Sequence, residues 1–223
     1  MRSARNPGVC SGVNDVPRFI VPCPVSLEPR LNISSALEDW HQQSWDRISR
    51  PVAIAWLAFY ALFLVYALRT TRDFLLIDNA NLVVHEAGHL LFGWLGETLG
   101  LYGGTLLQLI VPFALAASFA YRKHTAGTAF CAFFFFENFL YIATYMADAR
   151  EQDLPLVSVG GGETVEHDWE RIFSGWGVLA HDTQIAAVVR ALGWIGMLTV
   201  LGWLVWRAWQ DAQVAHARAA SAN

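Results

Sequence analysis

The chain has 223 residues, of which 55% are hydrophobic and 15% are charged, and its formal net charge is −4. Soluble domains carry about 25% charged residues, so this composition excludes an ordinary water-soluble globule. The basic residues are scattered, which excludes a nucleic-acid-binding surface, and the three cysteines provide no even-numbered disulfide framework.

Apolar segments define the expected organisation of the chain. Residues 1–50 are polar and proline-rich, which predicts a flexible N-terminal tail. About 20 apolar residues in a helix cross a hydrocarbon core of about 30 Å. Five segments of that kind follow, at 51–68, 74–95, 101–121, 126–147 and 185–206, with a polar loop at 148–183 and a short polar tail at 208–223. We therefore expect an all-α membrane protein, a bundle of about five transmembrane helices within 51–207.

Five spans give conflicting signals for orientation in the membrane. They would place on one side Arg69, Arg72, Arg122, Lys123 and Arg207. Basic residues in short loops favour the cytoplasmic side. The N-terminal tail would lie on the other side, yet it contains Arg30, Arg47 and Arg50. The short-loop signal favours the side of Arg122 as cytoplasmic.

The sequence His85-Glu86-x-x-His89 lies inside the second apolar segment. Two histidines four residues apart lie on one face of a helix. They can bind one zinc ion, with the glutamate beside the metal as general base. Zinc lowers the pKa of a bound water to about 7, which makes hydroxide available at neutral pH. Ionisable residues in a membrane segment mark functional sites. The alternative is a polar cluster that only holds helices together.

A catalytic zinc site needs a third protein ligand. The first candidate is Asp148, which ends the fourth predicted span and shares a polar helix face with Glu137. The alternative for this residue is a boundary position, paired with Arg150. Other candidates for the third ligand lie in the polar loop, which would then fold over the active site: His167, Asp168 and His181.

Further polar residues are candidates to hold the ligands in place: Asp78, Asn81, Glu137 and Asn138. Asp78 and Asn81 precede His85 by seven and four residues, so both lie near its face of the helix. Either side chain can accept a hydrogen bond from a ligand histidine. Gln108 in the third predicted span is another candidate for a polar contact toward the site. Glycines cluster just after the motif, at 93, 96, 100, 103 and 104, which predicts close helix packing.

The motif helix resembles that of the zincin metallopeptidases, and its apolar setting resembles the site-2 protease class of intramembrane proteases. In that family an aspartate on a later membrane helix completes the zinc site, in a motif rich in Asn and Pro that ends in Asp-Gly. The resemblance implies this role for Asp148, with Asn138 ten residues before it, although Ala149 replaces the Gly and no Pro lies between them. Segments 148–150 and 167–169 also resemble small bacterial membrane proteins.

The resemblance implies Zn²⁺ as cofactor, a membrane-protein or peptide substrate within the lipid bilayer, and a place in the bacterial inner membrane. We expect a zinc-dependent intramembrane metallopeptidase that hydrolyses a peptide bond through zinc-bound water activated by Glu86. One alternative is a membrane zinc hydrolase acting on a lipid or an amide. Another is a non-catalytic metal-binding or transport protein, which predicts that Glu86→Gln retains function.

Overall fold

The structure, a computed structural model, describes residues 38, 40–70, 74–154 and 167–221. The chain divides into two units, residues 1–42 and 43–223. In the first unit, residues 38 and 40–42 are helical. The functional residues discussed below all lie in the second unit.

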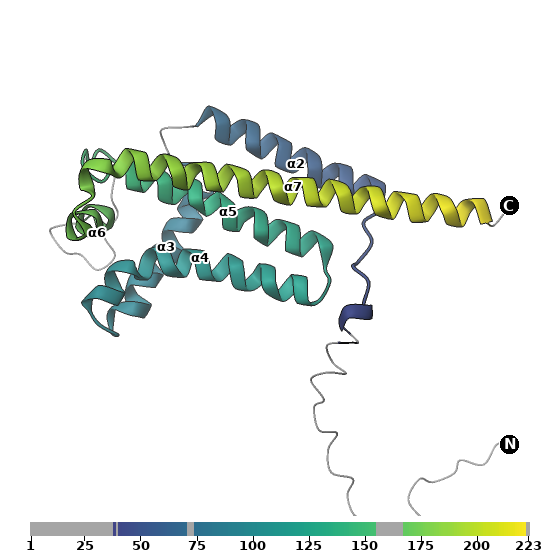
Figure 1. Cartoon of the computed structure of the whole chain (residues 1–223), viewed down its shortest axis with the longest axis horizontal. Helices are drawn as coiled ribbons and strands as arrows, with labels where there is room; N and C mark the ends of the chain where they lie inside the picture. Colours follow the sequence, from purple (N-terminus) through teal and green to yellow (C-terminus); the bar gives the residue numbers. More distant parts are fainter. Residues whose placement is uncertain (1–37, 39, 71–73, 155–166, 222–223) are drawn as a thin grey trace, which may run out of the picture. The chain divides into compact units, whose positions relative to one another are not determined.

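The described part of the second unit consists of helices and the turns between them, with no strands among these residues (Figure 1). Its elements are α2 (Arg50–Arg69), α3 (Asp78–Gly93), α4 (Glu97–Tyr121), α5 (Thr125–Ala147), α6 (Asp168–Trp176), the 3-10 turn η1 (Leu179–His181) and α7 (Asp182–Ser221). A tight turn joins α4 to α5, and α7 runs back along α5 with Gly193 and Gly196 against Phe136. The expectation of an all-α chain is confirmed for these residues.

Four helical segments are long and apolar enough to cross a membrane: α2, α4, α5 and the segment Leu179–Ser221 that contains α7. Half of the apolar window of α5 is buried, against 17–28% in the other three. α5 is therefore the central helix, and the others turn large apolar side chains outward, among them Leu62, Phe113 and Leu198. Exposed apolar surface on this scale is unfavourable in water and suits a lipid environment.

The second predicted span, at 74–95, is the exception to that pattern. The helix in this region, α3, has only 16 residues, which gives about 24 Å at 1.5 Å per residue and falls short of a core of about 30 Å. Its first turn contains Asp78, Asn79 and Asn81, and a turn at Trp94–Gly96 ends it. The described chain thus has four candidate spans rather than five, with α3 as a short helix beside them.

Two predicted boundaries also differ from the structure. The segment predicted as a polar loop at 148–183 contains α6 and η1. α6 starts after His167, whose Nδ1 accepts a hydrogen bond from Glu170 N at 3.3 Å, and ends at Gly177 with a left-handed φ of 70°. α7 continues through the predicted tail at 208–223 as far as Ser221, because its alanine-rich sequence contains no Gly or Pro there.

Glycines let α3 pack directly on α4. A Cβ atom added at Gly88 would lie 2.2 Å from the carbonyl oxygen of Gly103, so the two backbones touch at this crossing. The predicted close packing is confirmed at Gly100, Gly103 and Gly104, whereas a Cβ atom added at Gly93 would meet nothing within 4 Å. This contact sets the motif histidines directly against the first turns of α4.

A buried apolar cluster fixes α6 against the end of α5. It joins Tyr141 and Tyr145 of α5 to Trp169, Ile172 and Phe173 of α6. Each large apolar side chain buried in this way contributes about 1.5–3 kcal/mol. The first residue of α6, Asp168, is therefore held in a defined position next to α3.

Candidate metal centre

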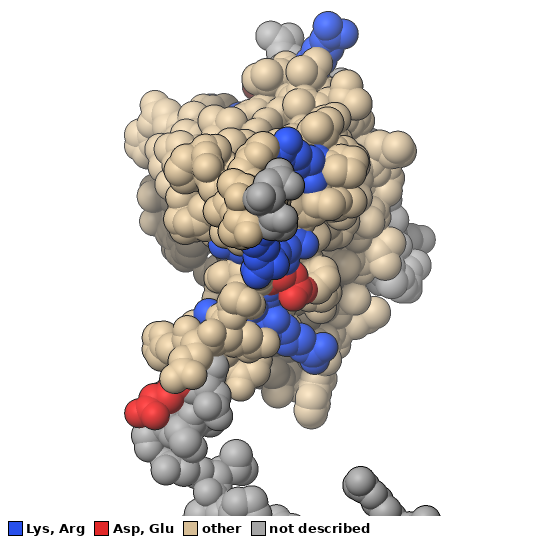
Figure 2. Space-filling view, turned by 90° about the vertical axis from the view of Figure 1, so that its right-hand side faces the viewer, with Lys and Arg blue, Asp and Glu red and all other residues tan. Residues whose placement is uncertain are grey.

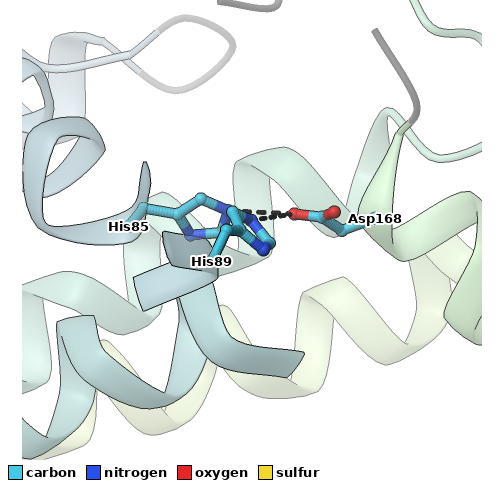
Figure 3. Close-up of side chains that lie close together, drawn as sticks. All are labelled: His85, His89 and Asp168. Atoms are coloured by element: carbon cyan, nitrogen blue, oxygen red, sulfur yellow. Dashed lines mark hydrogen bonds and ion pairs between the residues drawn. The ribbon is translucent and has the colours of Figure 1, made fainter. Parts of the chain in front are cut away.

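Three side chains from two separate helices meet at one point (Figure 3). His85 Nε2 and His89 Nε2 of α3 lie 2.9 Å and 3.0 Å from the same Oδ2 atom of Asp168 in α6. One ligand atom from each residue lies within 4.8 Å of the other two. The His85 side chain is 3% exposed and that of His89 is 25% exposed, so the cluster is buried on one side and open on the other.

The second nitrogen of each imidazole is also bonded. His85 Nδ1 lies 2.9 Å from Gln108 Oε1, and His89 Nδ1 lies 2.8 Å from the carbonyl oxygen of Gly100. Because these oxygens only accept hydrogen bonds, each Nδ1 must carry the proton. In the neutral imidazole the lone pair is then on Nε2, which is the atom that faces Asp168.

This arrangement requires a positive charge among the three groups. Two Nε2 lone pairs and a carboxylate oxygen repel one another at about 3 Å unless protons or a metal ion lie between them. Two histidines and an aspartate, with each histidine oriented by an oxygen acceptor behind it, form a donor set that suits zinc. The chemistry of these residues therefore fits a metal ion.

The space at the cluster also fits an ion. A Cβ atom at Gly104 would lie 2.6 Å from both His85 Nε2 and His89 Nε2, so the missing side chain leaves room beside both nitrogens. Tetrahedral zinc, with bonds of about 2.0–2.2 Å, separates its ligand atoms by about 3.4 Å. The observed separations of 2.9 Å and 3.0 Å need to widen by only a few tenths of an ångström.

The first turn of α6 holds Asp168 in place. Its backbone N–H donates to Tyr145 Oη at 3.2 Å, and the Tyr145 ring also packs against the rings of His85 and His167. Burial raises the pKa of Asp168, but the combined interactions with His85 and His89 lower it by more. The net shift of this pKa is therefore downward. Asp168 is therefore an anion over the neutral pH range, as a metal ligand must be.

Glu86 lies on the same helix as both histidines and is half-buried. Its carboxylate is within electrostatic reach of His85, His89 and Asp168. Among the described residues it makes no hydrogen bond or ion pair with a side chain or backbone group. A carboxylate beside the cluster with no other partner is free to accept a proton from water.

The structure does not place Asp148, the first-choice third ligand, in the cluster. Its carboxylate accepts hydrogen bonds from the backbone N–H groups of Asp153 at 2.9 Å and Leu154 at 3.2 Å, and its Oδ2 lies 3.5 Å from His167 Nε2. A carboxylate that closes a turn in this way is not available to the imidazoles of α3. Asp168, one of the alternatives, takes the position predicted for Asp148.

The other alternative ligands have different roles. His167 caps α6 through Nδ1 and faces Asp148 through Nε2. Burial lowers the pKa of His167 despite the nearby carboxylates of Asp148, Asp168 and Glu170. His181 is exposed, and its Nδ1 pairs with Gln184 Oε1 at 2.9 Å. Neither histidine belongs to the cluster. The alternative pairing of Asp148 with Arg150 is also absent, because Arg150 binds Asp182 at 2.7 Å.

Three of the four residues predicted to support the ligands, Asp78, Asn81 and Glu137, form a separate polar group. Asn81 Nδ2 donates to Asp78 Oδ1 at 3.2 Å and to Glu137 Oε2 at 3.1 Å, and Asp78 Oδ2 accepts from Leu75 N at 2.6 Å. Asn138 Nδ2 donates to the carbonyl oxygen of Phe134 within its own helix. None of these side chains contacts a ligand histidine.

Gln108 and Gly100 orient the histidines instead. An isolated amide inside an apolar helix is a signal that sequence reasoning can use, and it does indicate Gln108. A backbone carbonyl such as that of Gly100 leaves no signal of this kind, and neither does the acceptor role of Tyr145. No family model, curated protein or solved structure matches this chain, so the interpretation of the site depends on its geometry.

Proposed function

We propose that this protein is a zinc-dependent membrane metallopeptidase of the bacterial inner membrane. His85, His89 and Asp168 are the metal ligands, and Glu86 is the general base. One observation carries the proposal: two imidazoles with protonated Nδ1 atoms converge on a single carboxylate oxygen, in space left by a glycine. Protons alone would satisfy the charges, but they would not account for Glu86, which lies within electrostatic reach of all three groups and has no hydrogen-bond partner among the described residues.

A bound zinc ion would supply a Lewis acid that polarises a scissile carbonyl and makes water more acidic. His85, His89 and Asp168 would hold the ion, and a catalytic zinc site needs three protein ligands of this kind. Glu86 accepts the proton of the attacking water and delivers it to the leaving amine. Gln108 and the Gly100 carbonyl keep the ligand nitrogens deprotonated and correctly turned throughout.

The depth of the site favours a substrate at the membrane surface. Tyr145 lies two residues before the end of α5, and Gly100 lies three residues after the start of α4. At 1.5 Å per residue the cluster is thus within about 10 Å of the ends of the spanning helices, where water is available. A substrate helix must unwind locally to be cut there, because its carbonyl groups are already hydrogen-bonded.

Replacement of Glu86 by glutamine tests this function. Membranes containing wild-type protein or Glu86→Gln are compared by chemical labelling of new peptide N-termini and mass spectrometry, with Glu151→Gln, an exposed carboxylate, as matched control. We expect N-termini that appear with wild type and Glu151→Gln and disappear with Glu86→Gln, while zinc content stays constant. Glu86-dependent release of fatty acids without new N-termini would contradict a peptidase and indicate a lipid hydrolase.

A further inference from the structure

Three segments that are far apart in the sequence meet at the end of the bundle away from the metal centre. Asp46 N donates to the carbonyl oxygen of Lys123 at 2.9 Å, the rings of Trp45 and Trp203 lie 5.1 Å apart, and Ile48 N donates to Asp211 Oδ2 at 3.0 Å. The start of α2, the α4–α5 turn and the second half of α7 therefore lie side by side. We name this the distal end, and the opposite end, with α6, the site end.

Basic residues are concentrated at the distal end, where Figure 2 shows Lys and Arg side chains gathered over the surface. They come from three separate segments: Arg47, Arg50, Arg122, Lys123, Arg207 and Arg218. Two of them lie in the short α4–α5 turn, and short loops carry most weight in setting orientation. The described site end has Arg69, Arg150, Arg171 and Arg190. Arg150 pairs with Asp182, Arg171 pairs with Glu97, and Arg190 donates to Thr144 Oγ1 near the end of α5 at 3.1 Å.

Acidic residues have the opposite distribution, because the described distal end has only Asp46 and Asp211, the latter 3.6 Å from Arg207. The described site end has the following carboxylates: Glu97, Asp148, Glu151, Asp153, Asp168, Glu170 and Asp182. Tryptophans flank the apolar region at both ends, as they do at membrane interfaces. Trp206 and Trp209 are exposed toward the distal end, and Trp94 and Trp176 toward the site end. The bundle thus has two interfacial levels, one basic and one acidic.

The short length of α3 resolves the conflict in the five-span prediction. Because α3 does not span, Arg122, Lys123 and Arg207 fall on the same side as Arg47 and Arg50. Arg69 moves to the opposite side, next to the metal centre. The two orientation signals that opposed each other with five spans agree with four.

We propose that the distal end is cytoplasmic and that the metal centre opens on the opposite, non-cytoplasmic face of the membrane. If the protein is a peptidase, as proposed above, its substrates are polypeptide segments presented at the outer face of the membrane. This consequence rests on the proposed function, whereas the orientation itself does not. α7, with 40 residues and a length of about 60 Å, extends past the bilayer into the cytoplasm with its polar last turns.

Cysteine accessibility tests the orientation without any assay of activity. Cys10 and Cys23 are replaced by serine and Cys131 by alanine, and a single cysteine is introduced by Glu151→Cys at the site end or by Ala220→Cys at the distal end. Both positions are exposed. Intact spheroplasts are treated with a membrane-impermeant maleimide, and permeabilised spheroplasts control for the reactivity of each thiol.

We expect the Glu151→Cys protein to be labelled in intact spheroplasts and the Ala220→Cys protein only after permeabilisation. Labelling of Ala220→Cys in intact spheroplasts, alone or together with Glu151→Cys, would overturn the proposed orientation. A second variant adds Arg122→Glu and Lys123→Glu to the Ala220→Cys protein, and we expect it to become accessible from outside. If the orientation fails while cleavage dependent on Glu86 persists, the inference falls and the proposed function remains.

Discussion

Replacement of Gly104 by alanine places a methyl group where the metal ion is expected. The added Cβ would lie 2.6 Å from both His85 Nε2 and His89 Nε2, whereas ordinary contact begins at 3.4 Å. Each imidazole must therefore retreat by about 0.8 Å, and a metal site tolerates only about 0.2 Å of change in its bond lengths. Loss of an orienting partner alone costs about 10- to 100-fold in metal affinity, so we expect a loss of at least about 100-fold.

Fold stability should fall less than zinc affinity does. Alanine is favoured over glycine in a helix by about 1 kcal/mol, which offsets part of the strain at this position. Zinc affinity is measured by competition with a chromophoric chelator in detergent, and Tm of the apo-protein by tryptophan fluorescence. Gly93→Ala is the matched control, since nothing lies within 4 Å of its added Cβ. Wild-type zinc affinity in a folded Gly104→Ala protein would refute the placement of the site.

Three further substitutions separate ligand support from packing. The Asp148→Ala protein should keep its bound zinc but have a lower Tm, because Asp153 N and Leu154 N lose their hydrogen-bond acceptor. Loss of zinc with an unchanged Tm would show instead that Asp148 is a zinc ligand. Gln108→Leu removes the acceptor for His85 Nδ1 and should weaken zinc binding by about 10- to 100-fold, which the same chelator competition measures; an unchanged affinity would show that the tautomer is set otherwise. Gly88→Ala forces α3 away from α4 and should destabilise the fold by about 1–3 kcal/mol, seen as a lower Tm; an equal or higher Tm would contradict the direct backbone contact.

Sequence periodicity and hydropathy predict most of the fold. The spans at 51–68, 101–121 and 126–147 agree with α2, α4 and α5 within a few residues, because a long apolar segment has few alternatives to a helix in lipid. The prediction fails at α3, where hydropathy alone does not detect that polar residues at 78–81 and the turn at Trp94–Gly96 shorten the helix. The error in one span reversed the assigned side of every later loop.

The metal ligands were predictable to different degrees. His85 and His89 follow from helix geometry alone, since residues four apart share a face. The third ligand depends on how the segment after α5 folds back, and that is fixed by burial of Trp169, Ile172 and Phe173, far from the motif in sequence. Asp148 and Asp168 were chemically equivalent candidates until this packing placed one beside the imidazoles and the other in a turn.

The most direct test of the proposed metal centre is the zinc content of the full-length protein purified in detergent, compared with His85→Ala and Asp168→Ala. We predict one zinc per chain in the wild type and loss of zinc in both variants, with Tm values showing that all three proteins remain folded. Absence of zinc from the wild type after incubation with the metal would contradict the account. Full zinc occupancy in a folded Asp168→Ala protein would contradict the ligand set.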